Sequence, residues 1–212
     1  MAPVAVLLEE GPRRTFACAL DWPGWARSAK TSEGTDAALE ALESYRERYV
    51  AVLARRGVKA PVGALRVTER VRGDASTDFG VPGRVADADA RALRNPERER
   101  LATCVEASWD ALVLLEPRAL RLGPRGGGRS FEKIQRHVQD AEVAYARGLG
   151  LRVQDPAGDP AAVSALRARL VGLVRGEIAP DRDAKWPVRY GTRRIAWHAL
   201  DHVFEIEDRT EA

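Results

Sequence analysis

The chain changes its secondary-structure pattern once, near Asn95, and this change restricts the possible folds more than any other feature. Before that point, short hydrophobic runs and turns surround a single helical pattern, whereas every later pattern is helical. We therefore expect an α+β protein with a small β-β-β-α-β domain at 1–73 and four helices at 95–212. Residues 74–94 contain Gly and Pro without hydrophobic periodicity, which predicts a linker or a long surface loop.

The first region has the signals of a small sheet packed against one helix. The expected elements are strands at 4–8, 15–20, 26–29 and 65–71 and a helix at 35–55. The first two strands flank Gly11-Pro12, which predicts a hairpin, and a turn containing Trp22 and Trp25 precedes the third. These two indoles would either form a binding surface or cover the edge of the sheet.

The second region has clear helix-start signals. Asn95 and Asp159 are each followed directly by proline, and Ser130 can accept a hydrogen bond from the next helix. The last helix is expected at 192–208. Each helix has one apolar face, so an antiparallel four-helix bundle is the simplest way to bury all four faces.

Composition argues against several classes of protein. Lys and Arg number 34 against 31 Asp and Glu, and the resulting charge of +3 gives little support for nucleic-acid binding. Cys18 and Cys104 are far apart in sequence, so a disulfide framework is not expected. No apolar run has membrane-spanning length, and the N-terminal run lacks a basic leader, so we expect a cytoplasmic protein.

The three histidines of the chain all lie on apolar helix faces. His198 and His202 are four residues apart beside Ile195, and His137 is three residues after Ile134. Burial of an imidazole without a partner is costly. A divalent metal ion, such as Zn, Ni or Fe, held by all three rings would satisfy them and leave coordination positions open.

A simpler alternative is that each histidine is a core residue bonded to a carbonyl or a carboxylate. The zinc-peptidase interpretation is weaker, because its H-E-x-x-H pattern needs glutamate where Ala199 stands. Glu142 is expected to be solvated or to lie outside the ligand shell. Arg193 and Arg194 could hold a substrate carboxylate, although such a pair is usually solvated.

Two segments resemble a known group of proteins. SFEKIQRHV at 130–138, with Tyr145 further on, resembles the second helix of the DinB-like (YfiT-like) superfamily, and RRIAWHALDH at 193–202 resembles its last helix. The resemblance covers about residues 95–209 and implies that His137, His198 and His202 are the metal ligands. The N-terminal region, with its aromatic turn, resembles the small HicB-like fold.

The superfamily includes thiol-dependent S-transferases and isomerases that use a low-molecular-weight thiol, and many members of unknown activity. The resemblance thus implies a metal-dependent transferase or hydrolase acting on a small-molecule substrate, and a homodimer is a further expectation. The alternative is a non-catalytic binding or scaffold protein. An antitoxin-like nucleic-acid binder is the third hypothesis.

Overall fold

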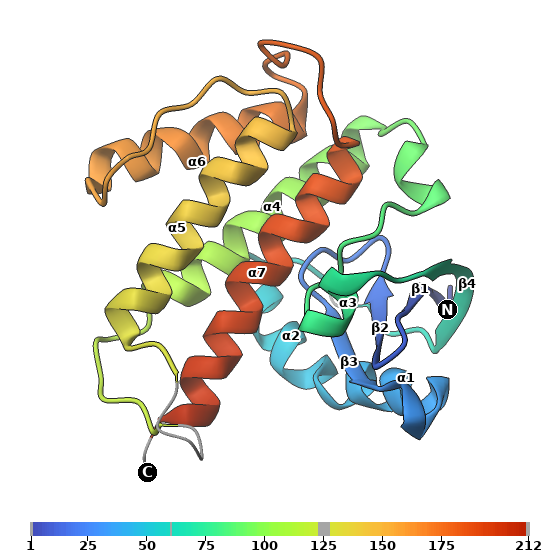
Figure 1. The fold of residues 1–212 in the computed structure, drawn as a ribbon. Helices are drawn as coiled ribbons and strands as arrows, with labels where there is room; N and C mark the ends of the chain where they lie inside the picture. Colours follow the sequence, from blue (N-terminus) through green and yellow to red (C-terminus); the bar gives the residue numbers. More distant parts are fainter. Residues whose placement is uncertain (1, 60, 123–127, 211–212) are drawn as a thin grey trace.

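The computed structural model describes residues 2–59, 61–122 and 128–210 and confirms the mixed α+β class (Figure 1). The elements in chain order are β1 (Val4–Glu10), β2 (Arg14–Ala19), β3 (Ala26–Lys30), η1 (Thr31–Glu33), α1 (Thr35–Ser44), α2 (Arg46–Ala54), β4 (Leu65–Arg72), α3 (Ala75–Phe79), η2 (Asp87–Ala90), α4 (Asn95–Val113), α5 (Phe131–Gly148), α6 (Pro160–Arg175) and α7 (Val188–Arg209). Among the described residues, none of the helices combines the length and hydrophobicity needed to span a membrane.

The four strands form one sheet in the order β3-β2-β1-β4. β1 pairs antiparallel with β2, as the predicted hairpin requires, and parallel with β4. β1 and β2 are central and largely buried, which explains their nearly continuous hydrophobic runs. β4 lies at an edge, and its residues alternate between half-buried and exposed.

The sheet and the C-terminal helices share one hydrophobic core. Val6 and Leu8 on one face of β1 belong to a cluster that also contains Leu42 of α1 and Leu200 of α7. Leu7, on the other face, packs in a cluster with Trp197. Because α7 contributes to both clusters, the N-terminal sheet packs directly against the helical region.

The predicted single helix at 35–55 is wrong in one respect, because it divides at Tyr45 into α1 and α2. Tyr45 has φ −95° and ψ 1°, which interrupts the helix. Its ring lies 3.7 Å from the Arg27 guanidinium and 5.3 Å from the Phe204 ring. These contacts join β3 and α7, so the break depends on tertiary packing that periodicity does not reveal.

The C-terminal helices begin close to the predicted positions. Ser130 and Asp159 accept hydrogen bonds from the first turns of α5 and α6, which confirms both as cap residues. α7 starts at Val188, directly after Pro187, so it is four residues longer at its start than predicted. The extra turn contributes the buried side chains of Arg189 and Tyr190.

The expected antiparallel packing holds for α5 against α7 but not for α4 against α7. Arg189 at the start of α7 donates to Glu97 at the start of α4, at 2.7 Å, so these two helices run in the same direction. The segment 149–159 folds back along α5, where Asp155 pairs with Arg136 at 2.8 Å. Figure 1 shows α6, which follows this segment, crossing the other helices.

The segment 74–94, predicted as a linker or surface loop, is attached to both regions. The buried Glu9 carboxylate of β1 accepts from the Thr77 hydroxyl and from the backbone amides of Gly83 and Arg84. Asp89 of η2 is also buried and pairs with Arg193 of α7. The segment 74–94 therefore packs between the sheet and α7.

Replacement of Leu200 tests the shared core. Leu200 is fully buried, and Leu200→Ala should lower the free energy of unfolding by about 2–5 kcal/mol in a single cooperative transition. Leu114, at the end of α4, is 61% exposed, and Leu114→Ala should change it by less than about 0.5 kcal/mol. Urea titration followed by circular dichroism measures both, and two separate transitions in either protein would contradict a common core.

Candidate metal centre

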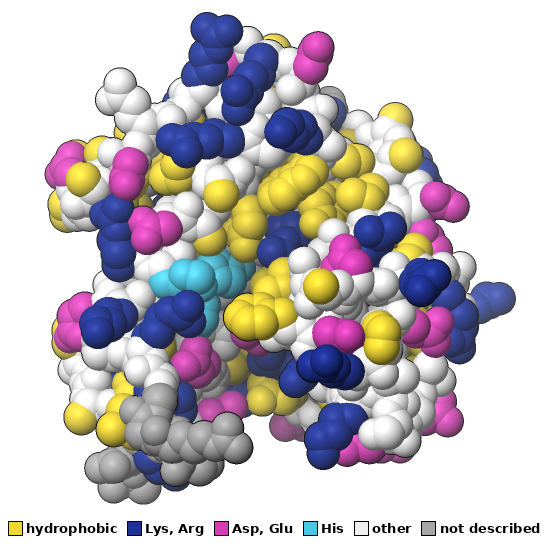
Figure 2. Space-filling model, viewed as in Figure 1, with side chains coloured by type: hydrophobic (Ala, Val, Ile, Leu, Met, Phe, Trp, Pro, Cys, Tyr) yellow, Lys and Arg dark blue, Asp and Glu magenta, His cyan; other side chains and the backbone are white. Residues whose placement is uncertain are grey.

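The three histidines meet where α5 packs against α7. One ring nitrogen from each of His137, His198 and His202 lies within 4.8 Å of the other two. The Nε2 atoms of His137 and His198 are 3.2 Å apart. Figure 2 shows histidine side chains at the molecular surface, bordered by hydrophobic side chains and by Lys or Arg. The prediction that the three histidine side chains lie close together is therefore confirmed.

Helix geometry accounts for the cluster. His198 and His202 are one turn apart on α7, so both rings leave the same face. α5 runs antiparallel to α7 and places the His137 ring 4.9 and 5.2 Å from the other two ring centroids. Tetrahedral zinc with Zn–N bonds of about 2.0–2.1 Å separates its ligand nitrogens by about 3.3 Å. Small side-chain rotations would therefore bring the three nitrogens to the spacing that a metal ion requires.

The surroundings favour the neutral forms of His198 and His137. Burial, together with the neighbouring His202 and His137, lowers the pKa of His198 to about 2. Burial also lowers the pKa of His137, with Arg129 and His202 acting in the same direction. Neutral imidazole has the nitrogen lone pair that metal binding uses, so His137 and His198 need not lose a proton to become ligands.

A carboxylate orients the third ring. Nδ1 of His202 lies 2.7 Å from Oε2 of Glu205, which leaves Nε2 available to a ligand. Arg209 donates to the other oxygen of Glu205 at 2.6 Å. Hydrogen bonding to His202 is the largest cause of the lowered pKa of Glu205. Glu205 is not among the site residues predicted from the sequence, but residues three apart on a helix are neighbours, and this spacing could have identified it.

The expectation that Arg193 and Arg194 form a solvated face is wrong, because both are buried. Arg193 pairs with Asp89, and Arg194 donates to the carbonyl of Pro82 at 2.8 Å and to the hydroxyl of Tyr145 at 3.2 Å. The long helix α7 is covered on this side by the segment 74–94, which the sequence alone did not place. Tyr145 also lies next to His198, with ring centroids 5.9 Å apart.

Glu142 lies outside the histidine cluster. Its side chain is buried and binds Arg167 of α6 through two hydrogen bonds of 3.0 and 2.8 Å. Burial raises its pKa, and Arg167 opposes this shift. The carboxylate thus joins α5 to α6, as a structural ion pair rather than as a solvated group.

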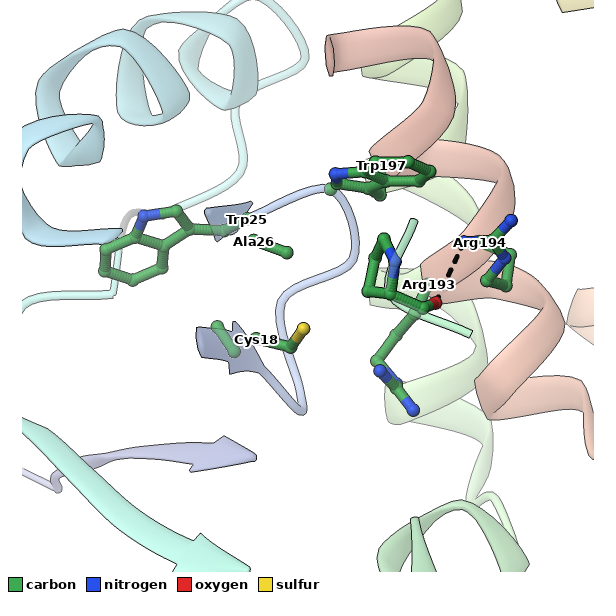
Figure 3. A pocket seen from close by; sticks show the side chains of 9 residues that line it. Cys18, Trp25, Ala26, Arg193, Arg194 and Trp197 are labelled. Atoms are coloured by element: carbon green, nitrogen blue, oxygen red, sulfur yellow. Dashed lines mark hydrogen bonds between the residues drawn. The ribbon is translucent and has the colours of Figure 1, made fainter. Parts of the chain in front are cut away.

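The cysteines and the paired tryptophans are also separate from the histidines. Burial raises the pKa of Cys18 to about 12 and that of Cys104 to about 11, so both are uncharged thiols. Cys18 lines a cavity of about 10 Å³ between the sheet and α7, with Trp25 and Trp197 on its wall (Figure 3). Trp25 stacks on Tyr49 of α2 and donates to a carbonyl of α1, so its indole packs against these two helices.

Comparison with known proteins gives no family for the chain. No family model matches it, and neither a curated protein nor a solved structure matches it. A function can therefore be inferred only from the geometry of the histidine cluster and its neighbours.

The Glu205 contact gives a test of the cluster as a metal centre. Glu205→Gln removes the charge that orients the His202 ring and should weaken zinc affinity about tenfold. Glu207→Gln is the matched control on the same helix, because Glu207 pairs with Arg48, and its zinc affinity should equal that of the parent. Competition with a fluorescent zinc indicator measures both, and equal affinities for the two variants would contradict the role of Glu205.

Proposed function

We propose that the chain is a metal-dependent enzyme of the DinB-like superfamily, in which α4–α7 form the four-helix bundle and His137, His198 and His202 hold one divalent cation. The observation that carries this proposal is the meeting of all three histidines of the chain within 4.8 Å. Three nitrogen ligands are typical of catalytic rather than structural zinc sites, because structural sites use four protein ligands. Zn, Ni and Fe all suit imidazole.

The chemistry follows from the open positions of such a centre. A cation with three imidazole ligands lowers the pKa of a bound water or thiol, or polarises a substrate oxygen. The chain's own groups prepare the site, since burial keeps His198 neutral and Glu205 holds the ring of His202. Substrates would enter from the surface at which Figure 2 shows the histidine side chains. We propose a thiol-dependent S-transferase or a small-molecule hydrolase as the reaction class.

Metal analysis of untagged protein tests this function. The parent should bind one equivalent of zinc, and His137→Ala, His198→Ala and His202→Ala should each weaken binding by more than about 100-fold, because a direct ligand contributes more than a group that only orients one. Gln135→Ala, also on α5, is the control and should keep one equivalent. Equilibrium dialysis with elemental analysis gives the stoichiometry.

Each outcome separates the hypotheses. A parent that binds no zinc, or variants that all retain it while folded, would contradict the metal centre and favour the scaffold protein. The HicB-like region as a nucleic-acid binder predicts binding that weakens steeply with salt, and its absence at low salt would remove that hypothesis.

A further inference from the structure

Arg194 is a buried cation with neutral partners. Its side chain lies on α7 and the residue is 8% exposed. Its Nη1 donates to the Pro82 carbonyl, as Figure 3 shows, and its Nη2 donates to the Tyr145 hydroxyl. Its guanidinium carbon lies 5.0 Å from the Trp197 ring and 5.4 Å from the Tyr145 ring. Within the described part of the chain, no carboxylate pairs with it, and its Nε is buried without any partner.

Four other arginines of this protein show what the Nε–Nη2 edge of a guanidinium can bind, whereas the Nε of Arg100 is, like that of Arg194, buried without a partner. In Arg167 and Arg193, Nε and Nη2 together donate to the two oxygens of one carboxylate. Arg56 and Arg175 bind carboxylates through the same pair of nitrogens. In Arg194 this edge meets only the Tyr145 hydroxyl, at the longer distance of 3.2 Å. Because Nε and Nη2 match the two oxygens of a carboxylate, the missing partner has that shape and charge.

The position of Arg194 connects this edge to the histidines. Arg194 precedes His198 by four residues on α7, so the two side chains share a helix face about 6 Å apart along the axis. Tyr145 touches both, by its hydroxyl with Arg194 and by its ring with His198. Nδ1 of His198 is a second buried nitrogen without a partner on this face. Figure 2 shows Lys or Arg side chains directly beside the histidines, within a hydrophobic rim.

We propose that Arg194, assisted by the Tyr145 hydroxyl, is the subsite for a carboxylate of the substrate. This inference rests on the proposed function and gives its substrate class: a small molecule with a carboxylate a few bonds from the group that faces the histidines. The carboxylate accepts from Nη2 of Arg194, and from Nε once the guanidinium turns away from the Tyr145 hydroxyl that now covers this edge, and it supplies the negative charge that this cation lacks. The hydrophobic rim excludes water and strengthens the pairing.

A purely structural role for Arg194 predicts a different behaviour. Its bonds to Pro82 and Tyr145 hold the segment 74–94 and α5 against α7, and losing them would lower stability without affecting any preference among ligands. The dependence of binding affinity on ligand charge therefore distinguishes the two roles, whereas a loss of protein stability does not.

The experiment compares two thiols of equal length on zinc-loaded protein, 3-mercaptopropionate and 3-mercaptopropionamide, by isothermal titration calorimetry. The parent should bind the carboxylate about tenfold more tightly than the amide, as expected for a charge-assisted hydrogen bond. Arg194→Gln should reduce this preference to less than about twofold, and Arg194→Lys should give an intermediate value, because lysine keeps the charge but loses the two-nitrogen edge.

Arg136→Gln is the matched control, because Arg136 is an exposed arginine one residue before His137 that pairs with Asp140 and Asp155. It should leave the preference unchanged. Equal binding of the two thiols to the parent, or an equal effect of Arg136→Gln and Arg194→Gln, overturns the subsite while the metal centre stands. A parent that binds no zinc overturns both proposals. If Arg194→Gln does not fold, the preference of the parent and the effect of Arg194→Lys decide the question.

Discussion

The burial of α7 on nearly every side is the constraint on which the rest of the structure depends. Of its 22 residues, 16 are buried, and these include three arginines and two histidines. A buried charge needs a partner, since an unpaired one costs several kcal/mol. The pairing of buried polar groups, as well as hydrophobic contact, therefore determines which segments pack against α7. Arg189 binds Asp21 and Glu97, and each pair joins α7 to another part of the chain.

These partners explain why the N-terminal sheet and the segment 74–94 lie where they do. The buried pair between Arg193 and Asp89 holds η2 on α7, and the hydrogen bonds to Glu9 attach the same segment to β1. The segment thus covers the side of α7 next to the histidines, and it brings the Pro82 carbonyl to Arg194. The small sheet supports the candidate centre indirectly, because it fixes the helix that carries two of the three histidines.

Much of the site was predictable because it depends on local spacing. The interval between His198 and His202 fixes both rings on one helix face, and the apolar neighbours of His137 show that its face is buried. The same spacing argument could have identified Glu205, three residues after His202. The buried states of Arg194 and Glu142 were not predictable in this way, because their covering residues come from segments remote in sequence.

The sequence by itself determined the elements: the four strands, the helix starts at Ser130 and Asp159, and the positions of the three histidines on apolar helix faces. Helical hydrogen bonds and the periodicity of burial act over a few residues, so a local pattern is sufficient to specify where these elements form. The tertiary structure alone decided the division of the helix at Tyr45, the parallel course of α4 and α7, and the neutral surroundings of Arg194. Each depends on contacts between residues distant in sequence, where side-chain packing and charge pairing select one arrangement among several with the same local pattern.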